Sequence, residues 1–253
     1  MKKVWIAGHN GMVGRALVKK LSNENLELIY KEKKDLNLLE YEAVSKFLKK
    51  EKPDMVFVAA GKVGGILANN TFPANFIYEN IAIASNVINS CHVNDIQNLI
   101  YLGSSCIYPR NCKQPIKEEY LLTGELEKTN QWYAIAKISG LKLCEAYNHQ
   151  YQRNYLSVQP TNLYGPHDNF NLKTGHVLPA LLRKIYEAKK NNTSNIEIWG
   201  TGRSLREFLY VDDLADALFF LSQNRTKENL INIGSDDETS IIALAKMIFS
   251  VLN

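Results

Sequence analysis

The chain has 253 residues, of which 45% are hydrophobic and 22% are charged, a composition typical of globular proteins. This length suits one large domain or a main domain with a smaller partner. The net charge of +4 comes from scattered lysines without a basic stripe, so we expect an anionic small-molecule ligand and no nucleic acid. No apolar run approaches the roughly 18 residues of a membrane span, so we expect no membrane association.

The first strand is expected directly at the N-terminus. The apolar patch after Lys2 and Lys3 is too short for a signal peptide and turns at once into glycines, which favours a buried strand. The cysteines form no C-x-x-C pair, which indicates reduced thiols in a cytoplasmic protein and no metal site; they are Cys91, Cys106, Cys112 and Cys144.

Strand-like apolar runs alternate with helix-like segments up to Gly165. Strands are predicted over 3–8, 26–30, 55–60, 98–104 and 155–165, and helices over 12–23, 40–53, 75–94 and 133–151. Strands that are apolar on both faces and alternate with helices are typical of a parallel sheet covered on both sides. The sequence therefore predicts an α/β protein with a Rossmann-like, doubly wound parallel sheet.

The pattern loosens after Gly165. Helices are predicted over 176–190, 211–223 and 240–253, and short strands over 196–200 and 230–234. We expect 1–165 to form a dinucleotide-binding Rossmann domain to which 206–234 returns. Residues 166–205 and 235–253 then make up a smaller, partial substrate-binding lobe.

A glycine-rich turn joins the first predicted strand to the first predicted helix. Glycines at 8, 11 and 14 permit a tight turn, close approach of the backbone to a pyrophosphate, and close helix packing, while the helix N-terminus favours negative charge. This context predicts dinucleotide binding, with a purely structural turn as the alternative. The expected cofactor-binding residues of the turn are Gly8, Asn10, Gly11, Met12, Val13 and Gly14.

The loop after the second strand bears on which dinucleotide is bound. Lys31 and Lys33 could meet the 2′-phosphate of NADP(H), whereas Glu32 between them is the residue type that holds the 2′-hydroxyl of NAD. The lysines favour NADP(H), and a solvated basic loop is the alternative.

Tyr133 and Lys137 lie four positions apart in a predicted helix, so they share one face. An ammonium beside a phenol favours the phenolate, so we expect Lys137 to lower the pKa of Tyr133 and also to hold the cofactor's ribose. Ser104, at the end of the fourth strand, offers a hydroxyl that could orient a substrate oxygen. The alternative is a surface tyrosine with a solvated neighbour.

The order of serine, tyrosine and lysine after a glycine turn resembles the extended short-chain dehydrogenase/reductases. Seven motifs narrow this resemblance to the GDP-L-fucose synthase family: GHNGMVGRAL, AAGKVGGI, LGSSCIYP, YAIAKISG, PTNLYGPHDNF, GHVLPALLRK and REFLYVDDLADA. The resemblance implies NADP(H), a GDP-sugar substrate and a homodimer built on the helices around 74–94 and 133–150. The catalytic residues that it implies are Ser104, Cys106, Tyr133, Lys137 and His176, with Arg206 on the substrate phosphate.

The implied reaction is epimerisation of GDP-4-keto-6-deoxy-D-mannose at C3 and C5, followed by NADPH-dependent reduction at C4. Cys106 and His176 would supply the base and the acid for the inversions. By spacing alone each could instead be structural. Three hypotheses stay open: the full epimerase-reductase, a C4 reductase that acts on this or another GDP-4-keto sugar such as a heptose, and an NADP-binding protein without turnover.

Further candidates contact the ligands. Asn162 is expected near the nicotinamide or the sugar, Trp199 could stack on guanine or fill a core, and Lys62 could contact substrate or be a loop lysine. Asn10 stands where the resembled family usually has an arginine, which weakens the preference for NADP(H). Family members also continue through a further C-terminal portion, so we expect the substrate lobe to be incomplete.

Overall fold

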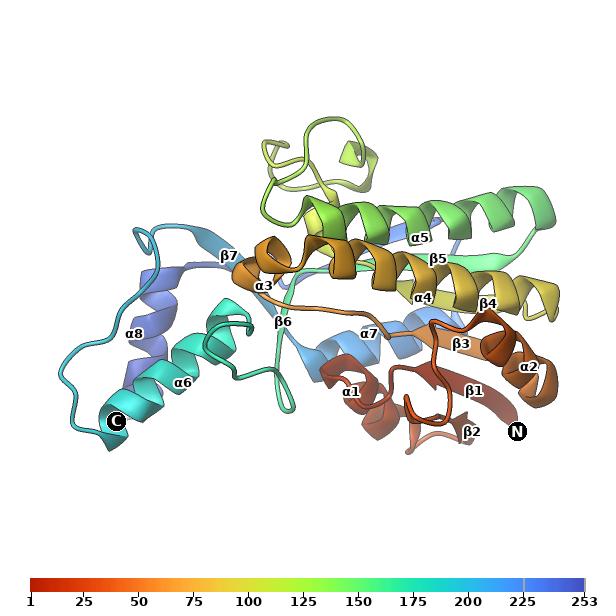
Figure 1. The fold of residues 1–253 in the computed structure, drawn as a ribbon, viewed down its shortest axis with the longest axis horizontal. Helices are drawn as coiled ribbons and strands as arrows, with labels where there is room; N and C mark the ends of the chain where they lie inside the picture. The colour runs from red at the N-terminus through yellow and green to blue at the C-terminus, as the bar shows by residue number, and fades with distance from the viewer. Residues whose placement is uncertain (225, 253) are drawn as a thin grey trace.

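The computed structural model describes residues 1–224 and 226–252, and its centre is a six-stranded sheet (Figure 1). The strand order is β2-β1-β3-β4-β5-β8, and every neighbouring pair is parallel. The strands are β1 (Lys2–Ala7), β2 (Leu26–Ile29), β3 (Met55–Val58), β4 (Asn98–Leu102), β5 (Asn154–Pro160) and β8 (Leu230–Ile233). The predicted doubly wound α/β fold is confirmed.

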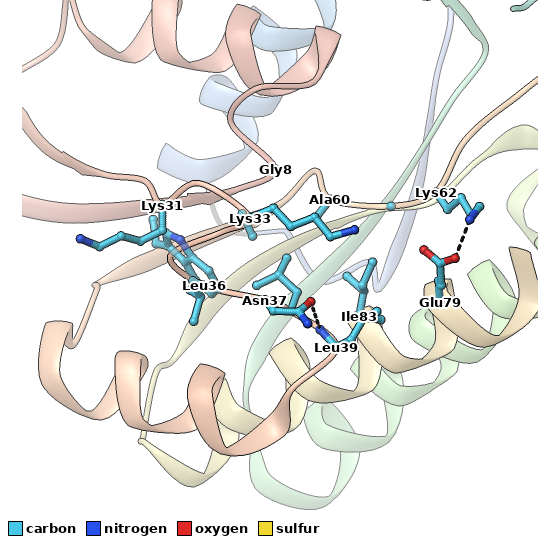
Figure 2. A pocket seen from close by; sticks show the side chains of 14 residues that line it. Gly8, Lys31, Lys33, Leu36, Asn37, Leu39, Ala60, Lys62, Glu79 and Ile83 are labelled. Atoms are coloured by element: carbon cyan, nitrogen blue, oxygen red, sulfur yellow. Dashed lines mark hydrogen bonds and ion pairs between the residues drawn. The ribbon is translucent and has the colours of Figure 1, made fainter. Parts of the chain in front are cut away.

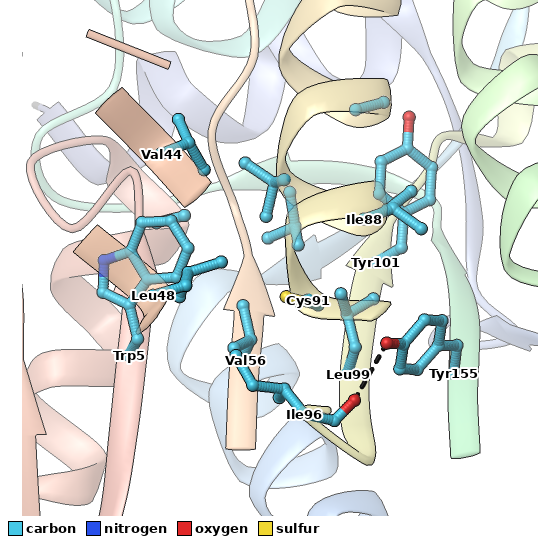
Figure 3. Close-up of a cluster of buried hydrophobic side chains, with 14 of the residues drawn as sticks. Trp5, Val44, Leu48, Val56, Ile88, Cys91, Ile96, Leu99, Tyr101 and Tyr155 are labelled. Carbon is cyan, nitrogen blue, oxygen red and sulfur yellow. Dashed lines mark hydrogen bonds between the residues drawn. The ribbon is translucent and has the colours of Figure 1, made fainter. Parts of the chain in front are cut away.

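One face of the sheet is covered by α2 (Tyr41–Glu51), α4 (Pro73–Val93) and α5 (Gln131–Tyr151). Figure 3 shows the core beneath these helices, where Trp5, Val56 and Leu99 from three strands pack against Val44 and Leu48 of α2 and against apolar side chains of α4. The hydroxyl of Tyr155 donates to the carbonyl of Ile96 at 2.9 Å, so this buried polar group is satisfied.

The opposite face is covered by α1 (Met12–Leu21) and α7 (Val211–Gln223). Its core takes the alternate residues of the same strands, such as Ile6, Phe57 and Ile100, against Leu17 and Leu214. Successive side chains of a strand point to opposite faces, so a strand with helices on both sides must be apolar throughout. This is why continuous apolar runs predicted where the strands of the main sheet lie.

A second, smaller sheet lies beyond the carboxyl ends of the main strands. It has the order β6-β7-β9, from β6 (Asn162–Tyr164), β7 (Leu205–Tyr210) and β9 (Glu238–Ser240); β6 and β7 are parallel, and β7 and β9 are antiparallel. The helices α6 (Val177–Lys190) and α8 (Ile241–Leu252) lie side by side at this end of the molecule (Figure 1) and share a core of Leu181, Ile185, Leu244, Ala245 and Ile248.

Two predicted strands differ in the structure. The strand predicted over 155–165 is divided at Thr161 into β5 and β6, which belong to different sheets. The strand predicted over 196–200 is irregular, because Ile196 and Ile198 pack against the core of α6 and α8 without a neighbouring strand. The sequence reading missed α3 (Ile66–Thr71), β7 and β9.

The predicted domain boundaries remain a prediction. The structure shows only to which of the two sheets each segment belongs. The helix α7 packs against the main sheet and β8 joins it, whereas β7 joins the small sheet. Residue 253, in the predicted last helix and lobe, and residue 225, in the predicted returning segment, lie outside the described residues.

An irregular excursion follows β4 and leads to α5 (Figure 1). It contains two short 3₁₀ turns, η1 (Ser105–Ile107) and η2 (Glu118–Tyr120), and Ile107 and Tyr108 anchor it against Ile138 and Leu141 of α5. None of the helices in the described part of the chain combines the length and apolar character that crossing a membrane requires.

Candidate active site

The glycine turn folds as the sequence predicted. Gly8 has a φ of 91°, and a Cβ there would lie 2.6 Å from the backbone nitrogen of Ala60, so no other residue fits without strain. A Cβ on Gly14 would lie 2.6 Å from Cα of His9, whereas a Cβ on Gly11 would meet only the carbonyl oxygen of Gly8, at 3.5 Å. Gly8 and Gly14 are therefore needed for packing, and Gly11, at the N-terminus of α1, leaves an open surface for a phosphate.

A cavity of about 390 Å³ lies beside this turn, and we call it the turn cavity (Figure 2). Gly8, Lys31 and Lys33 line it, together with apolar side chains of the loop after β2. Lys62 lines this cavity too, and its Nζ is 2.5 Å from Oε1 of Glu79. The backbone nitrogen of Lys62 donates to Oδ1 of Asn80, and its carbonyl accepts from Nδ2 of Asn80, both at 3.0 Å. These bonds hold Lys62 beside the predicted cofactor residues and away from the other predicted substrate residues.

Glu32 turns toward the glycine turn. Its Oε2 accepts a hydrogen bond from Nδ2 of Asn10 at 2.9 Å, and its Oε1 lies 3.7 Å from Nε2 of His9. The hydrogen bond from Asn10 lowers the pKa of the Glu32 carboxyl, so the group is ionised at neutral pH. A carboxylate and the two lysines thus lie at the same end of β2.

A second cavity of about 440 Å³ opens between the carboxyl edge of the main sheet and the small lobe, and we call it the site cavity. It brings together seven of the predicted residues: Ser104, Cys106, Tyr133, Asn162, His176, Trp199 and Arg206. They come from the end of β4, α5, β6, the start of α6, the loop after α6, and β7. Segments more than 100 residues apart in the sequence therefore converge on one space.

Ser104 and Cys106 follow β4 directly. The backbone nitrogen of Ser104 donates to Oε1 of Gln159 at 2.5 Å, and the backbone nitrogen of Cys106 donates to Oγ of Ser104 at 3.4 Å. Burial raises the pKa of the Cys106 thiol to about 11, although Ser104 and Lys137 oppose the shift. The residue is therefore a protonated thiol at neutral pH.

Lys137 lies beneath Tyr133 and is buried. Its Nζ donates to the carbonyl of Leu102 at 2.8 Å and lies 5.7 Å from the ring centre of Tyr133. Burial lowers the pKa of Lys137 to about 8. Burial also raises the pKa of Tyr133, with a smaller contribution from Cys106, so the expected lowering by Lys137 is wrong for this structure. The phenol is enclosed, and the ammonium is engaged by a backbone carbonyl.

His176 occupies the N-cap position of α6 and is exposed. The preceding loop is held by hydrogen bonds from the backbone nitrogen of Gly65 to the carbonyl of Thr174 and from that of Gly175 to Asn171, at 2.9 and 2.8 Å. Desolvation lowers the pKa of His176, and the nearby Asp168 carboxylate opposes this shift. The imidazole is therefore neutral at neutral pH and able to accept a proton.

The far end of the site cavity carries cations and an indole. Nζ of Lys184 lies 5.2 Å from the ring centre of Trp199 and donates to the carbonyl of Glu197 at 2.9 Å. Arg206 is exposed, and within residues 1–224 and 226–252 its guanidinium donates one hydrogen bond, to the carbonyl of Leu205 at 2.6 Å. Asn162 donates to the carbonyl of Glu207 at 2.9 Å.

Sequence reasoning missed five residues. Lys184, Asn69 and Asn130 line the site cavity, whereas Gln159 bonds to Ser104 and Asp168 acts on His176. Lys184 could have been found, because it follows His176 by eight positions, close to two helical turns, and so shares its side of α6. The others carry no sequence signal of their own. Across residues 1–224 and 226–252 no group of three or more His, Cys, Asp or Glu side chains could hold a metal ion.

A doubly wound parallel sheet, a glycine turn at its first helix and a serine–tyrosine–lysine set at the carboxyl edge define a dinucleotide-binding α/β protein equipped for chemistry at a carbonyl. The chain belongs to the NAD dependent epimerase/dehydratase family, whose pattern matches residues 4–234.

Individual relatives narrow the comparison. The chain is 52% identical to the GDP-L-fucose synthase of Sinorhizobium fredii over 251 residues, which are 99% of this chain and 80% of the relative. Two solved structures are also similar. A GDP-L-fucose synthetase from Naegleria fowleri bound to NADP has a TM-score of 0.89 at 31% identity, covering all of this chain and 78% of that one. A GDP-mannoheptose C4 reductase from Campylobacter jejuni with NADP bound has a TM-score of 0.89 at 38% identity, covering 99% and 85%. These relatives confirm the resemblance inferred from the motifs.

Proposed function

We propose that the chain is a GDP-L-fucose synthase, which epimerises GDP-4-keto-6-deoxy-D-mannose at C3 and C5 and reduces it at C4. The observation that carries this proposal is the site cavity, where Ser104, Cys106, Tyr133 and His176 face one space. A 52% identical relative with this activity in its name supports the choice of substrate.

The cofactor is NADP(H), and the residues present fit it. Gly11 leaves the start of α1 uncovered for the pyrophosphate, and Lys31 and Lys33 line the turn cavity where the adenosine end would lie. Lys137, Tyr133 and Asn162 would hold the nicotinamide end. When bound, NADPH supplies the hydride for C4 of the sugar.

The inversions require a base on one face of the sugar and an acid on the other. The ketone at C4 acidifies the hydrogens on C3 and C5. In the free protein His176 is a neutral imidazole and Cys106 a protonated thiol, so His176 can accept the proton and Cys106 can donate one to the opposite face. After one inversion the two groups have exchanged protonation states, and exchange with solvent resets them.

Charge develops on O4 in both the inversions and the reduction. Ser104 and Tyr133 can donate hydrogen bonds to this oxygen, and Tyr133 can protonate it when C4 is reduced. Its raised pKa keeps the phenol protonated and therefore suited to donate. Donation leaves a phenolate above the buried Lys137, whose Nζ lies 5.7 Å from the ring centre, and a proton from water restores the phenol.

The nucleotide end is assigned to Trp199, Arg206 and Lys184. Arginine suits bidentate contact with a diphosphate, and the exposed guanidinium of Arg206 is free of ion pairs among the described residues. Trp199 exposes 59% of its surface, which leaves the indole available for stacking on guanine.

A homodimer through α4 and α5 is part of the proposal. Large apolar side chains are exposed on these helices, namely Tyr78, Val93, Trp132, Ile135 and Tyr151. Sedimentation of the chain beside an Ile135→Asp variant tests this: a dimer that the variant weakens is expected, and a monomeric parent chain would contradict it. Use of NADPH and of a free Cys106 thiol fits the reducing conditions of the cytoplasm.

The deciding experiment follows NADPH consumption with GDP-4-keto-6-deoxy-D-mannose in deuterated water, and the product is analysed by NMR. The proposal expects the fucose configuration with deuterium at C3 and C5. Cys106→Ser and His176→Gln should abolish most of this incorporation, whereas Cys112→Ser, outside the site cavity, should not change it.

Other results would favour the remaining hypotheses. NADPH consumption that gives the rhamnose configuration without deuterium at these carbons would make the chain a C4 reductase, the activity named for a 38% identical relative that acts on a heptose. NADPH binding without consumption would indicate a non-catalytic NADP-binding protein or a different ketosugar.

A further inference from the structure

Residues 61–65 link the two cavities, and we call them the linking segment. They run from the end of β3 to the start of α3 (Figure 1). The first two residues of the segment line the turn cavity, whereas the last two, Gly64 and Gly65, line the site cavity. At this second end the segment meets the turn that precedes His176.

Gly65 and Gly175 form a close backbone contact there, and we call it the glycine clasp. The backbone nitrogen of Gly65 donates to the carbonyl of Thr174 at 2.9 Å. A Cβ on Gly65 would lie 2.4 Å from the carbonyl oxygen of Gly175, an approach at which one of the two atoms must shift. Because the obstacle is backbone, no side-chain movement could relieve this contact. The clasp therefore requires a glycine at position 65.

Gly175 is restricted in the same way by its own turn. A Cβ there would lie 2.3 Å from the carbonyl oxygen of Asn169 and 2.7 Å from that of Asn171. The backbone nitrogen of Gly175 donates to the carbonyl of Asn171 at 2.8 Å. Nδ2 of Asn169 donates to Oγ1 of Thr174 at 3.1 Å. The turn is thus closed by its own bonds and is held against the linking segment by the clasp.

His176 follows Gly175 directly and is the N-cap residue of α6. The core that α6 shares with α8 fixes the backbone after His176, whereas the clasp fixes the backbone before it. Together they set the direction of the bond from Cα to Cβ, and so the place of the imidazole on the wall of the site cavity. A general base must come within about 3.2 Å of the group whose proton it accepts, so a small shift of this backbone would slow proton transfer.

We infer that the glycine clasp positions His176 for the inversions at C3 and C5, with Gly65 as a positioning residue. The role of His176 as the base rests on the proposed function. Ser104 and Tyr133, which act on O4, are carried by the end of β4 and by α5, beside the main sheet. Disturbing the clasp should therefore slow the inversions more than the reduction.

The test compares the parent chain with Gly65→Ala, using GDP-4-keto-6-deoxy-D-mannose and NADPH in deuterated water with NMR of the product. We expect deuterium incorporation at C3 and C5 to fall by about tenfold or more, because a misplacement of about 1 Å can cost about 100-fold in rate. The proportion of product with the rhamnose configuration should rise. The affinity for NADPH should stay within about twofold. A change that only destabilised the fold would lower inversion and reduction in equal proportion.

Two more variants complete the test. Asn169→Ala removes the side-chain bonds of Asn169 to Thr174 and Asn171 and adds no atoms, so it tests the clasp even if Gly65→Ala does not fold. It should change the product ratio in the same direction by a smaller factor. Gly124→Ala is the control, because its Cβ would meet the side chain of Pro109 at 3.2 Å, outside the site cavity. It should leave the ratio unchanged.

The outcomes separate this inference from the proposed function. An unchanged product ratio in Gly65→Ala, or an equal loss of inversion and reduction, would overturn the role of the clasp. If Gly65→Ala does not fold, an unchanged ratio in Asn169→Ala would overturn it. A parent chain that yields the rhamnose configuration without deuterium would instead overturn the proposed function, and with it the role of His176 as a base.

Discussion

Replacing Lys137 with Met should make the protein more stable at neutral pH while removing its activity. Lys137 is 5% exposed, and burial lowers its pKa to about 8 from the ordinary 10.5. Below pH 8 the ammonium is charged in both the folded and the unfolded state, and folding must desolvate it. Methionine has a similar length and carries no charge, so this cost disappears.

The magnitude follows from the pKa difference. The interval between about 8 and 10.5 corresponds to about 3 kcal/mol, since one pKa unit is about 1.4 kcal/mol. Loss of the hydrogen bond from Nζ to the carbonyl of Leu102 subtracts about 1 kcal/mol. The Lys137→Met variant should therefore unfold with a free energy about 2 kcal/mol higher at pH 7.

The pH dependence gives a sharper test than the absolute gain. Between pH 8 and 10.5 the unfolded state binds more protons at Lys137 than the folded state does, so the stability of the parent chain rises with pH. The advantage of the variant should shrink by about 2 kcal/mol between pH 7 and pH 9.5. Groups away from Lys137 titrate equally in both proteins and cancel in the difference. Cys106, whose pKa Lys137 lowers, has a pKa of about 11 in the folded parent chain and stays largely protonated up to pH 9.5 in both folded proteins.

Urea unfolding of both proteins at pH 7, 8 and 9.5 measures this difference. Lys142→Met is the control, because Lys142 lies on the same helix with its Nζ at the surface, 2.7 Å from Glu145. A difference between the parent chain and Lys137→Met that stays flat with pH would refute the reasoning. A variant that is less stable than the parent chain at pH 7 would show that the Leu102 bond outweighs the desolvation cost.

Three further predictions concern the ligand sites. Gly14→Ala should lower the unfolding temperature by several degrees, because its Cβ would lie 2.6 Å from Cα of His9. Gly11→Ala should leave the unfolding temperature unchanged and should weaken NADPH binding, which fluorescence measures. Glu32→Gln should raise the ratio of kcat/KM for NADPH to that for NADH by about tenfold, because it removes a carboxylate from the end of β2 where a 2′-phosphate would lie. An unchanged ratio would mean that the phosphate binds elsewhere. Arg206→Ala should raise the KM for the GDP-sugar by about tenfold or more in steady-state assays with little change in kcat, and a loss confined to kcat would contradict a phosphate contact.

Local signals predicted much of the candidate site. The glycine turn, the serine and cysteine after β4, and the tyrosine and lysine of α5 each follow from spacing along a single strand or helix. The structure places Gly8 on the wall of the turn cavity, and Ser104, Cys106 and Tyr133 on the wall of the site cavity. Lys137 lies directly beneath Tyr133. The roles assigned to these residues remain proposals.

The errors came from contacts between distant segments. Lys62, a candidate substrate contact or loop lysine, is paired with Glu79 beside the turn cavity, and its role remains a proposal. Tyr133 was expected to have a lowered pKa, but burial raises it, and the sequence carries no measure of how far a phenol is enclosed. The division of residues 155–165 at Thr161 depends on β7, which arrives more than 40 positions later in the chain.

The sequence by itself determined the order of the strands and helices of the main sheet, because burial on both faces makes each of these strands apolar and each covering helix periodic. It also determined the chemical identity of the reactive groups. Only the tertiary structure decided which of these groups share a cavity and how far desolvation shifts their pKa values. Those properties arise where separate segments exclude water from one another, and no single stretch of the chain encodes that enclosure.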